Sequence, residues 1–287
     1  MAETPLMATV RGITTLRTTI SAWKRQGFTV GFVPTMGALH EGHLTLVREA
    51  GQRADRVVAS VFVNPTQFAA HEDLGSYPRD EARDAELLAS AGCALMYAPS
   101  VEEMYPEGAT TTTISVGAPA EGLEGAFRPQ MFGGVALVVA KLLNQVQPDV
   151  AVFGEKDYQQ LSVIRRMVRD LDIPVEIVGS PTIRDDHGLA LSSRNAYLSE
   201  DELEVARRLN GVLAEAGARA GAGGAIPGIA TSAREALLHA GFSHVDYVAV
   251  RRADDLAAFD GGLVDGPARV LAAAWLGRTR LIDNMAV

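Results

Sequence analysis

The stretch GFVPTMGALHEGHL, residues 31–44, decides the fold of this chain. It begins as an apolar run, continues through a turn rich in proline and glycine, and ends with two histidines, His40 and His43. The β-branched and aromatic residues of 28–33 predict a buried strand, and apolar residues recur at helical spacing from Leu44 onward. A strand therefore leads through a tight turn into a helix.

This turn favours a phosphate ligand. Unpaired N–H groups at a helix start and the positive end of the helix dipole both attract anions. His40 and His43 are three residues apart on one helix face, so both imidazoles can donate to the same phosphate oxygens, and Gly42 leaves room for a ligand. The alternative is that both histidines are ordinary cap and surface residues. A zinc site is disfavoured because Cys93 is the only cysteine and no third histidine lies nearby.

Composition narrows the function classes. The 287 residues include 26 basic and 35 acidic side chains, a net charge of -9 without a long basic run, so we expect no nucleic-acid partner. A single cysteine excludes a disulfide within the chain and fits a reducing compartment. The first residues lack an export-signal pattern, and no run of about eighteen apolar residues occurs. We therefore expect a cytoplasmic protein with no membrane partner.

Strands alternate with helices along the first 182 residues, which predicts an α/β fold with a Rossmann-like, doubly wound parallel sheet. The character changes near residue 183, so a smaller C-terminal α+β domain is predicted over 183–287, after a domain over 1–182. Further strands are expected at 56–63, 94–98, 150–153, 174–178, 245–250, 268–275 and 279–283. Helices are expected at 80–91, 135–143, 160–171, 232–240 and from a capping box at 199–202, with a frayed helix end and loop at 214–230.

Polar side chains follow several of the predicted parallel strands, at the edge where such sheets bind ligands. Lys156 suits triphosphate oxygens and Asp157 suits ribose hydroxyls, although the pair could also be solvated. Gln67 and Gln160 are neutral amides, which suit a small hydroxy acid whose carboxylate must stay nucleophilic. Alternatively, Gln67 and Gln160 are polar surface residues that bind no ligand.

The segment Ser192-Ser193-Arg194 places two hydroxyls beside a guanidinium. Arginine forks to phosphate and serine donates beside it, so the segment is a compact candidate for anion binding. The alternative is a simple turn before the helix that the residues 199–202 cap.

Taken together, these motifs resemble the pantothenate synthetase (pantoate–β-alanine ligase) family of the nucleotidylyltransferase superfamily. The similar motifs are PTMGALHEGH at 34–43, FVNP at 62–65 with QF at 67–68, YPR at 77–79, MYP at 104–106, FGEKDYQQ at 153–160, LSSRN at 191–195 and LIDN at 281–284. Because they occur in order along most of the chain, the resemblance is far more specific than the two histidines alone.

The resemblance implies a two-step ligation. Pantoate attacks the α-phosphate of ATP to give a pantoyl adenylate and pyrophosphate, and β-alanine then displaces AMP to give pantothenate. Mg²⁺ is expected to enter with ATP, held by phosphate oxygens and water, with no protein metal ligand and no tightly bound organic cofactor. The family also implies a homodimer and a C-terminal domain that acts as a lid over the nucleotide.

The resemblance also implies roles for individual residues. The catalytic, phosphate-holding residues would be His40, His43, Lys156, Ser192, Ser193 and Arg194. Further ATP contacts would come from Pro34, Met36, Gly154, Asp157, Ile183 and Leu191. Pantoate would be bound by Met36, Gln67 and Gln160.

One position departs from the family pattern. The family usually has histidine in Arg-Pro-x-His-Phe, where this chain has Met131. We expect weaker substrate affinity from the lost donor, without loss of activity. Two other functions stay open: a nucleotidylyltransferase that stops at a nucleotidyl product, such as one acting on phosphopantetheine, and a nucleotide-binding regulator without turnover.

Overall fold

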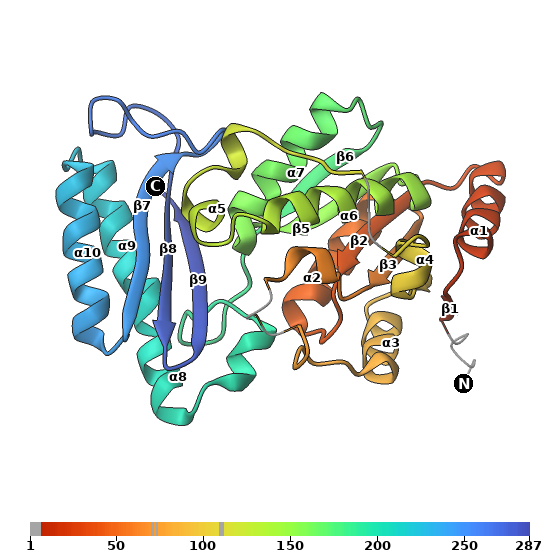
Figure 1. Cartoon of the computed structure of the whole chain (residues 1–287), viewed down its shortest axis with the longest axis horizontal. Coiled ribbons are helices and arrows are strands. Elements are labelled where there is room, and N and C mark those ends of the chain that lie inside the picture. Colours follow the sequence, from red (N-terminus) through yellow and green to blue (C-terminus); the bar gives the residue numbers. More distant parts are fainter. Residues whose placement is uncertain (1–6, 70–71, 73, 109–111) are drawn as a thin grey trace. The chain divides into compact units, whose positions relative to one another are not determined.

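The computed structural model describes residues 7–69, 72, 74–108 and 112–287 (Figure 1). Its contacts divide the chain into two compact units, which we describe separately. Unit 1 comprises Met1–Val116, Gln130–Glu155 and Val163–Ser180, and unit 2 comprises Gly117–Pro129, Lys156–Ser162 and Pro181–Val287. The predicted domain boundary between residues 182 and 183 stays a prediction.

Unit 1 contains a six-stranded sheet in the order β1-β4-β3-β2-β5-β6, with every neighbouring pair parallel. Its strands are β1 (Ala8–Val10), β2 (Val30–Thr35), β3 (Arg56–Val61), β4 (Leu95–Tyr97), β5 (Val150–Gly154) and β6 (Glu176–Ser180). The strand order reverses between β2 and β5, which makes their carboxyl ends the topological switch point where open α/β sheets bind ligands. The predicted α/β fold with a doubly wound parallel sheet is confirmed.

Helices bury both faces of this sheet. Alternate side chains of a strand point to opposite faces, and neighbouring Phe32 and Val33 of β2 are both 0% exposed. The helices are α1 (Ile13–Arg25), α2 (Glu41–Arg53), α3 (Glu81–Ser90), α4 (Val101–Met104), α6 (Met131–Val146) and α7 (Tyr158–Asp170), with a short 3₁₀ helix η1 at Pro65–Gln67. The α7 helix crosses the division, since its first turn belongs to unit 2.

Among the elements of unit 1 that were not predicted from the sequence are β1 and α1. The three residues of β1 are too few for a periodic signal, and two of them are exposed. The α1 helix contains four threonines and buries only Leu16 and Ile20, so neither propensity nor pattern identifies it. Cys93 is a buried core residue, and desolvation raises the pKa of its thiol to about 11.

Unit 2 is built on an antiparallel sheet of β7 (His244–Arg252), β8 (Ala268–Leu276) and β9 (Thr279–Ala286). The α9 (Arg208–Gly221) and α10 (Ile226–Ala240) helices pack on it, with α8 (Glu200–Ala206) before them. A second apolar cluster joins Leu123 of α5 (Leu123–Phe127) and Tyr158 to residues of β7 and β8. The remaining short 3₁₀ helices are η2 (Ala118–Ala120), η3 (Glu155–Asp157) and η4 (Ser193–Tyr197). The smaller α+β region is therefore confirmed.

The expected frayed helix end and loop at 214–230 is wrong in its extent. Helix α9 continues to Gly221 and α10 begins at Ile226, so only four residues link them. Gly217 and Gly221 lie within α9, close to Val287 of the same unit, since a Cβ at either position would be in ordinary van der Waals contact with that side chain. Tertiary contact overrides local propensity here. Among the described residues, no helix combines the length and hydropathy needed to cross a membrane.

Candidate functional site

The predicted phosphate turn lies at the switch point of unit 1. Hydrogen-bonded pairing between β2 and β5 ends at Phe32 and Ala151, before Pro34, which has no N–H to donate. The strands therefore separate beyond this point, with Pro34 on β2 and Gly154 at the end of β5. This places two of the predicted ATP-binding residues on the two strands that flank the switch point.

The turn itself has an unusual backbone. Gly37 and Ala38 adopt left-handed conformations, with φ values of 82° and 52°. Asp84 of α3 stabilises them because its carboxylate accepts hydrogen bonds from the N–H of Ala38 at 3.0 Å and of Leu39 at 2.8 Å. A Cβ at Gly37 would lie 2.8 Å from the same carboxylate, so only glycine fits there.

Sequence reasoning missed Asp84. It is 2% exposed, and its burial raises the pKa of its carboxyl, an effect that the two N–H donors only partly offset. A signal was present, since Asp84 lies four residues before the buried Leu88 and therefore on the apolar face of α3. A carboxylate on such a face needs hydrogen-bond partners, and the phosphate turn supplies them.

His40 and His43 form the start of α2. The Nδ1 atom of His40 accepts from the N–H of Gly42 at 3.2 Å, and Nδ1 of His43 accepts from the N–H of His40 at 3.3 Å. The ring centroids are 4.1 Å apart. Because each Nδ1 accepts a hydrogen bond, a neutral ring carries its own proton on Nε2, so each Nε2 is a hydrogen-bond donor. The two histidines are thus a helix cap and a pair of adjacent donors at once.

Met36 and Gln67 are also brought together in unit 1. The Gln67 Nε2 donates to the Met36 sulfur at 3.1 Å, while Oε1 accepts from Nδ2 of Asn64 at 3.1 Å. Asn64 is 1% exposed, and its Oδ1 also accepts from the Tyr105 hydroxyl at 2.8 Å. Asn64 therefore fixes the amide orientation of Gln67, so that the donor end faces Met36.

Gly134 of α6 allows η1 to approach closely. A Cβ at this position would lie 2.4 Å from the Thr66 carbonyl oxygen and 2.8 Å from the Gln67 nitrogen. The carbonyl of Gly134 also accepts from Asn64 at 3.3 Å. The position of Gln67 therefore depends on the absence of a side chain at residue 134. Met131, where the family usually has histidine, is buried at the first residue of the same helix.

Gly134→Ala is expected to displace η1, to lower the free energy of unfolding by about 1–3 kcal/mol and to weaken binding of the substrate that the family resemblance assigns to Gln67. Gly133→Ala is the matched control, because its Cβ would meet only the Ile114 carbonyl, at an ordinary 3.5 Å. We compare the two variants by their thermal unfolding midpoints and by their initial reaction rates. Equal behaviour of the two variants would contradict the role of Gly134.

The other predicted residues belong to unit 2. The Lys156 ammonium lies 3.7 Å from the Asp157 carboxylate, and the Lys156 side chain is 20% exposed. Gln160 follows one turn later on α7, partly exposed, whereas its neighbour Gln159 is 3% exposed. Gln159 accepts from the Glu124 N–H and donates to the carbonyls of 119, 121 and 122. Gln159 is thus a structural residue that holds the 117–129 segment.

Ile183 and Leu191 are paired by the main chain, since the Leu191 N–H donates to the Ile183 carbonyl at 2.9 Å. They close a hairpin whose turn is held by Asp185. Ser192 follows directly and caps η4, its hydroxyl accepting from the Arg194 N–H at 3.3 Å. Ser192, Ser193 and Arg194 are all partly exposed. The predicted anion-binding segment, Ser192–Arg194, therefore begins directly at the end of this hairpin.

Comparison with known proteins identifies the family of this chain. The family model described as pantoate–β-alanine ligase matches residues 8–286. Pantothenate synthetase from Caulobacter vibrioides is 59% identical over 279 residues, which cover 97% of this chain and 98% of that protein. The corresponding protein of Mesorhizobium japonicum is 57% identical over 278 residues, covering 97% of each.

Solved structures give the same result. The crystal structure of pantothenate synthetase from Thermus thermophilus is 48% identical with a TM-score of 0.89, covering 97% of this chain and 99% of that one. A pantoate–β-alanine ligase from Francisella tularensis, crystallised with β-γ ATP and β-alanine, is 32% identical with a TM-score of 0.82, covering 98% and 97%. The chain therefore belongs to the pantoate–β-alanine ligase family, whose members are named pantothenate synthetases, and it is an enzyme of that class.

Proposed function

We propose that this enzyme condenses pantoate with β-alanine at the expense of ATP, through a pantoyl adenylate. The observation that carries the proposal is the histidine pair at the switch point, because backbone donors to both Nδ1 atoms make both Nε2 atoms proton donors. The Francisella relative crystallised with β-γ ATP and β-alanine supports these two compounds as ligands.

In the first step, a carboxylate oxygen of pantoate attacks the α-phosphorus of ATP. The bond to the β-phosphate breaks, and pyrophosphate leaves with the electron pair. Negative charge grows on the leaving group, and preorganised donors stabilise it. We assign this role to His40, His43, Lys156, Ser192, Ser193 and Arg194.

Pantoate itself is bound through neutral groups in this proposal. Gln67 presents its amide nitrogen next to Met36, and a neutral donor orients a carboxylate without the strong pairing that would lower its nucleophilicity. Gln160 is assigned the same role. Pro34, Met36, Gly154, Asp157, Ile183 and Leu191 are assigned the remaining contacts with ATP.

In the second step, the neutral amine of β-alanine attacks the acyl carbon of the adenylate. The bond from that carbon to the phosphate oxygen breaks, AMP leaves with the electron pair, and the amine loses a proton to solvent water. The reaction requires no protein nucleophile, and positioning of the neutral amine supplies much of the rate.

Mg²⁺ is proposed to enter with ATP, where the triphosphate oxygens and water are suitable ligands for a hard cation. The assigned side chains fit this, since most are cationic or neutral donors to phosphate. When bound, the ion neutralises phosphate charge. Homodimerisation and the lid role of the C-terminal domain are proposed from the family resemblance alone, and a cytoplasmic location from the cysteine content and the lack of an export-signal pattern.

The function is tested by following pyrophosphate and AMP release from purified protein with Mg-ATP, leaving out pantoate and β-alanine in turn. Pyrophosphate release with pantoate alone, and sustained AMP release only with both substrates, are expected. Release of pyrophosphate without pantoate dependence would instead indicate a different nucleotidylyl transfer. A folded protein that binds ATP without turnover would indicate a regulator.

Arg194→Ala is expected to fold normally and to slow pantoate-dependent pyrophosphate release about 10- to 100-fold, because a hydrogen bond to a charged group contributes roughly 1.5–3 kcal/mol. Stopped-flow measurement of the first turnover isolates this step from product release. Arg208→Ala on α9 is the control for loss of an arginine in the same unit. Full pyrophosphate release by Arg194→Ala would exclude the assigned role.

A further inference from the structure

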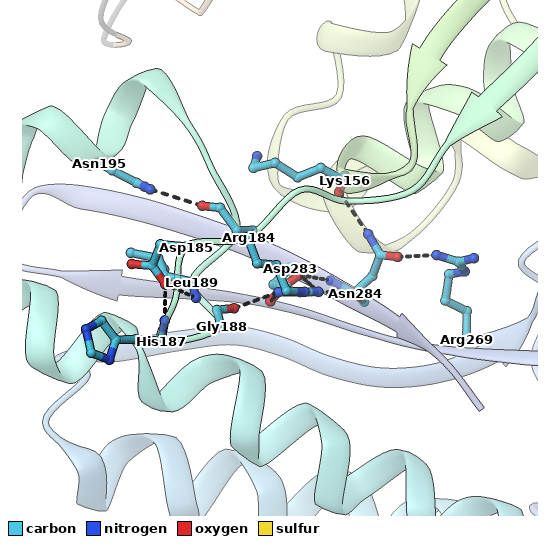
Figure 2. A network of polar contacts seen from close by, with 11 residues as sticks. Lys156, Arg184, Asp185, His187, Gly188, Leu189, Asn195, Arg269, Asp283 and Asn284 are labelled. Atoms are coloured by element: carbon cyan, nitrogen blue, oxygen red, sulfur yellow. Dashed lines mark hydrogen bonds and ion pairs between the residues drawn. The ribbon is translucent and has the colours of Figure 1, made fainter. Parts of the chain in front are cut away.

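Two adjacent polar residues of β9, Asp283 and Asn284, are each 3% exposed (Figure 2). They lie in the middle of an edge strand of the unit 2 sheet, opposite Ala272 and Leu271 of β8. Buried polar side chains are nearly always hydrogen-bonded, and such hydrogen bonds make the segments that they join rigid. Each of the two residues holds a different segment that the proposed function assigns to ATP.

Asp283 holds the hairpin of 183–191. Its two carboxylate oxygens accept from the two terminal nitrogens of Arg184 at 2.7 and 2.9 Å (Figure 2). Arg184 also donates to the carbonyls of Gly188 at 3.0 Å and Asn284 at 3.2 Å. A forked pair of this kind restricts direction as well as distance. The guanidinium therefore fixes the hairpin against β9.

The hairpin passes this restraint on to the Ser192–Arg194 segment. Arg184 and Ala190 form an antiparallel bridge across it. The Asn195 side chain, just beyond Arg194, donates to the Ala190 carbonyl at 3.0 Å (Figure 2). The three anion-binding candidates thus lie between two fixed points.

Asn284 holds the main chain at Lys156. Its Nδ2 donates to the Lys156 carbonyl at 2.8 Å, and its Oδ1 accepts from Arg269 at 2.6 Å (Figure 2). The Arg269 guanidinium lies 3.8 Å from the centroid of the Tyr158 ring, so it also contacts the next turn of this segment. Only a side chain with one donor and one acceptor serves both partners, which asparagine supplies.

We propose that Asp283 and Asn284 are positioning residues that set Lys156 and the Ser192–Arg194 segment in one fixed geometry for the triphosphate. The inference rests on the proposed function, because that function assigns these groups to phosphate. A rigid common support matters because small misplacement of phosphate donors costs rate steeply. Two segments that are 35 residues or more apart in sequence are thereby aligned through a single strand.

Asn284→Asp tests the proposal. The carboxylate keeps an acceptor for Arg269, but it cannot donate to the Lys156 carbonyl and repels it. We expect the kcat/KM for ATP in pantoate-dependent pyrophosphate release to fall about 10- to 100-fold, while the KM for pantoate stays within about twofold. Calorimetric titration with a non-hydrolysable ATP analogue should show the same loss of affinity.

Asn144→Asp is the control for the same amide-to-carboxylate change, because the exposed Asn144 of α6 likewise donates to a backbone carbonyl, that of Ala140 in the same helix, at 2.8 Å. It should leave both KM values unchanged. Arg184→Lys keeps the positive charge but loses the paired hydrogen bonds to Asp283. It should lower the affinity for ATP without changing the KM for pantoate, and it replaces Asn284→Asp as the test if that variant does not fold. A folded Asn284→Asp with unchanged ATP affinity, or with equal losses for ATP and pantoate, would overturn the proposal. Failure of the wild-type protein to release pyrophosphate with pantoate would overturn the proposed function instead.

Discussion

His40→Asn and His43→Asn are each expected to slow pantoate-dependent pyrophosphate release about 100- to 1000-fold, the usual cost of one preorganised transition-state donor. Both histidines accept a backbone N–H through Nδ1, and an asparagine Oδ1 occupies nearly the same place. The substitution therefore keeps the helix cap and removes only Nε2. Single-turnover pyrophosphate release and thermal unfolding, measured on the same samples, separate the two functions of each ring.

Glutamine provides the complementary variant, since its amide nitrogen reaches toward the position of Nε2. His43→Gln is expected to recover part of the rate that His43→Asn loses. His239→Asn is the control, because His239 is exposed in the last turn of α10. Full activity of both asparagine variants would show that the histidines act only as caps, which is the alternative that the sequence left open.

The sequence predicted five of the six parallel strands, all except β1, and the phosphate turn, because their signals are local. Buried strands are short apolar runs, and the start of α2 follows from a proline-glycine turn before a helical period. In the structure, that turn, Gly154 and the Met36–Gln67 pair lie at the ends of strands in unit 1. The site assignments, which came from these local motifs and from the family resemblance, stay predictions.

The residues that support the candidate site were not predictable in this way. The Asp84 carboxylate meets the N–H of Leu39 across 45 residues, and Asn284 meets Lys156 across 128. Such contacts leave no periodic pattern, because each depends on where the fold brings two distant segments. The same is true of Gly134, whose missing side chain matters only because η1 lies against α6.

A buried charge network in unit 2 shows the same limit and has a large expected effect. Arg280 donates to the Glu124 carboxylate at 2.6 and 2.7 Å and to Asp246 at 2.6 Å. The side chains of Glu124, Asp246 and Arg280 are 7%, 6% and 14% exposed. A register shift between Val245 and Tyr247 makes Asp246 the extra residue of β7. This network fixes the 117–129 segment to the unit 2 sheet.

Electrostatic effects in this network favour the charged guanidinium. Burial alone would lower the pKa of Arg280, but the contacts with Glu124 and Asp246 outweigh it and raise the pKa above its ordinary value. Desolvation, with the neighbouring Glu124 carboxylate, raises the pKa of Tyr247, so its hydroxyl stays protonated and donates to Glu124 at 2.8 Å. Arg280 is therefore the cation that balances the charge of both carboxylates, Glu124 and Asp246.

Arg280→Met is expected to lower the free energy of unfolding by about 3–5 kcal/mol, because it leaves two buried carboxylates without their cation. The change should lower the thermal midpoint by about 10 °C.

In a Trp23→Phe background, the remaining Trp275 reports unit 2 by fluorescence, since its indole nitrogen donates to Asp246 at 3.1 Å. Arg252→Met is the matched control, as its partner Asp265 is 61% exposed and such a pair contributes about 1 kcal/mol or less. Adding Glu124→Gln to Arg280→Met should restore part of the stability, because it removes one of the two unpaired buried carboxylates. Equal thermal midpoints for Arg280→Met and Arg252→Met would show that the network contributes no more than a surface ion pair.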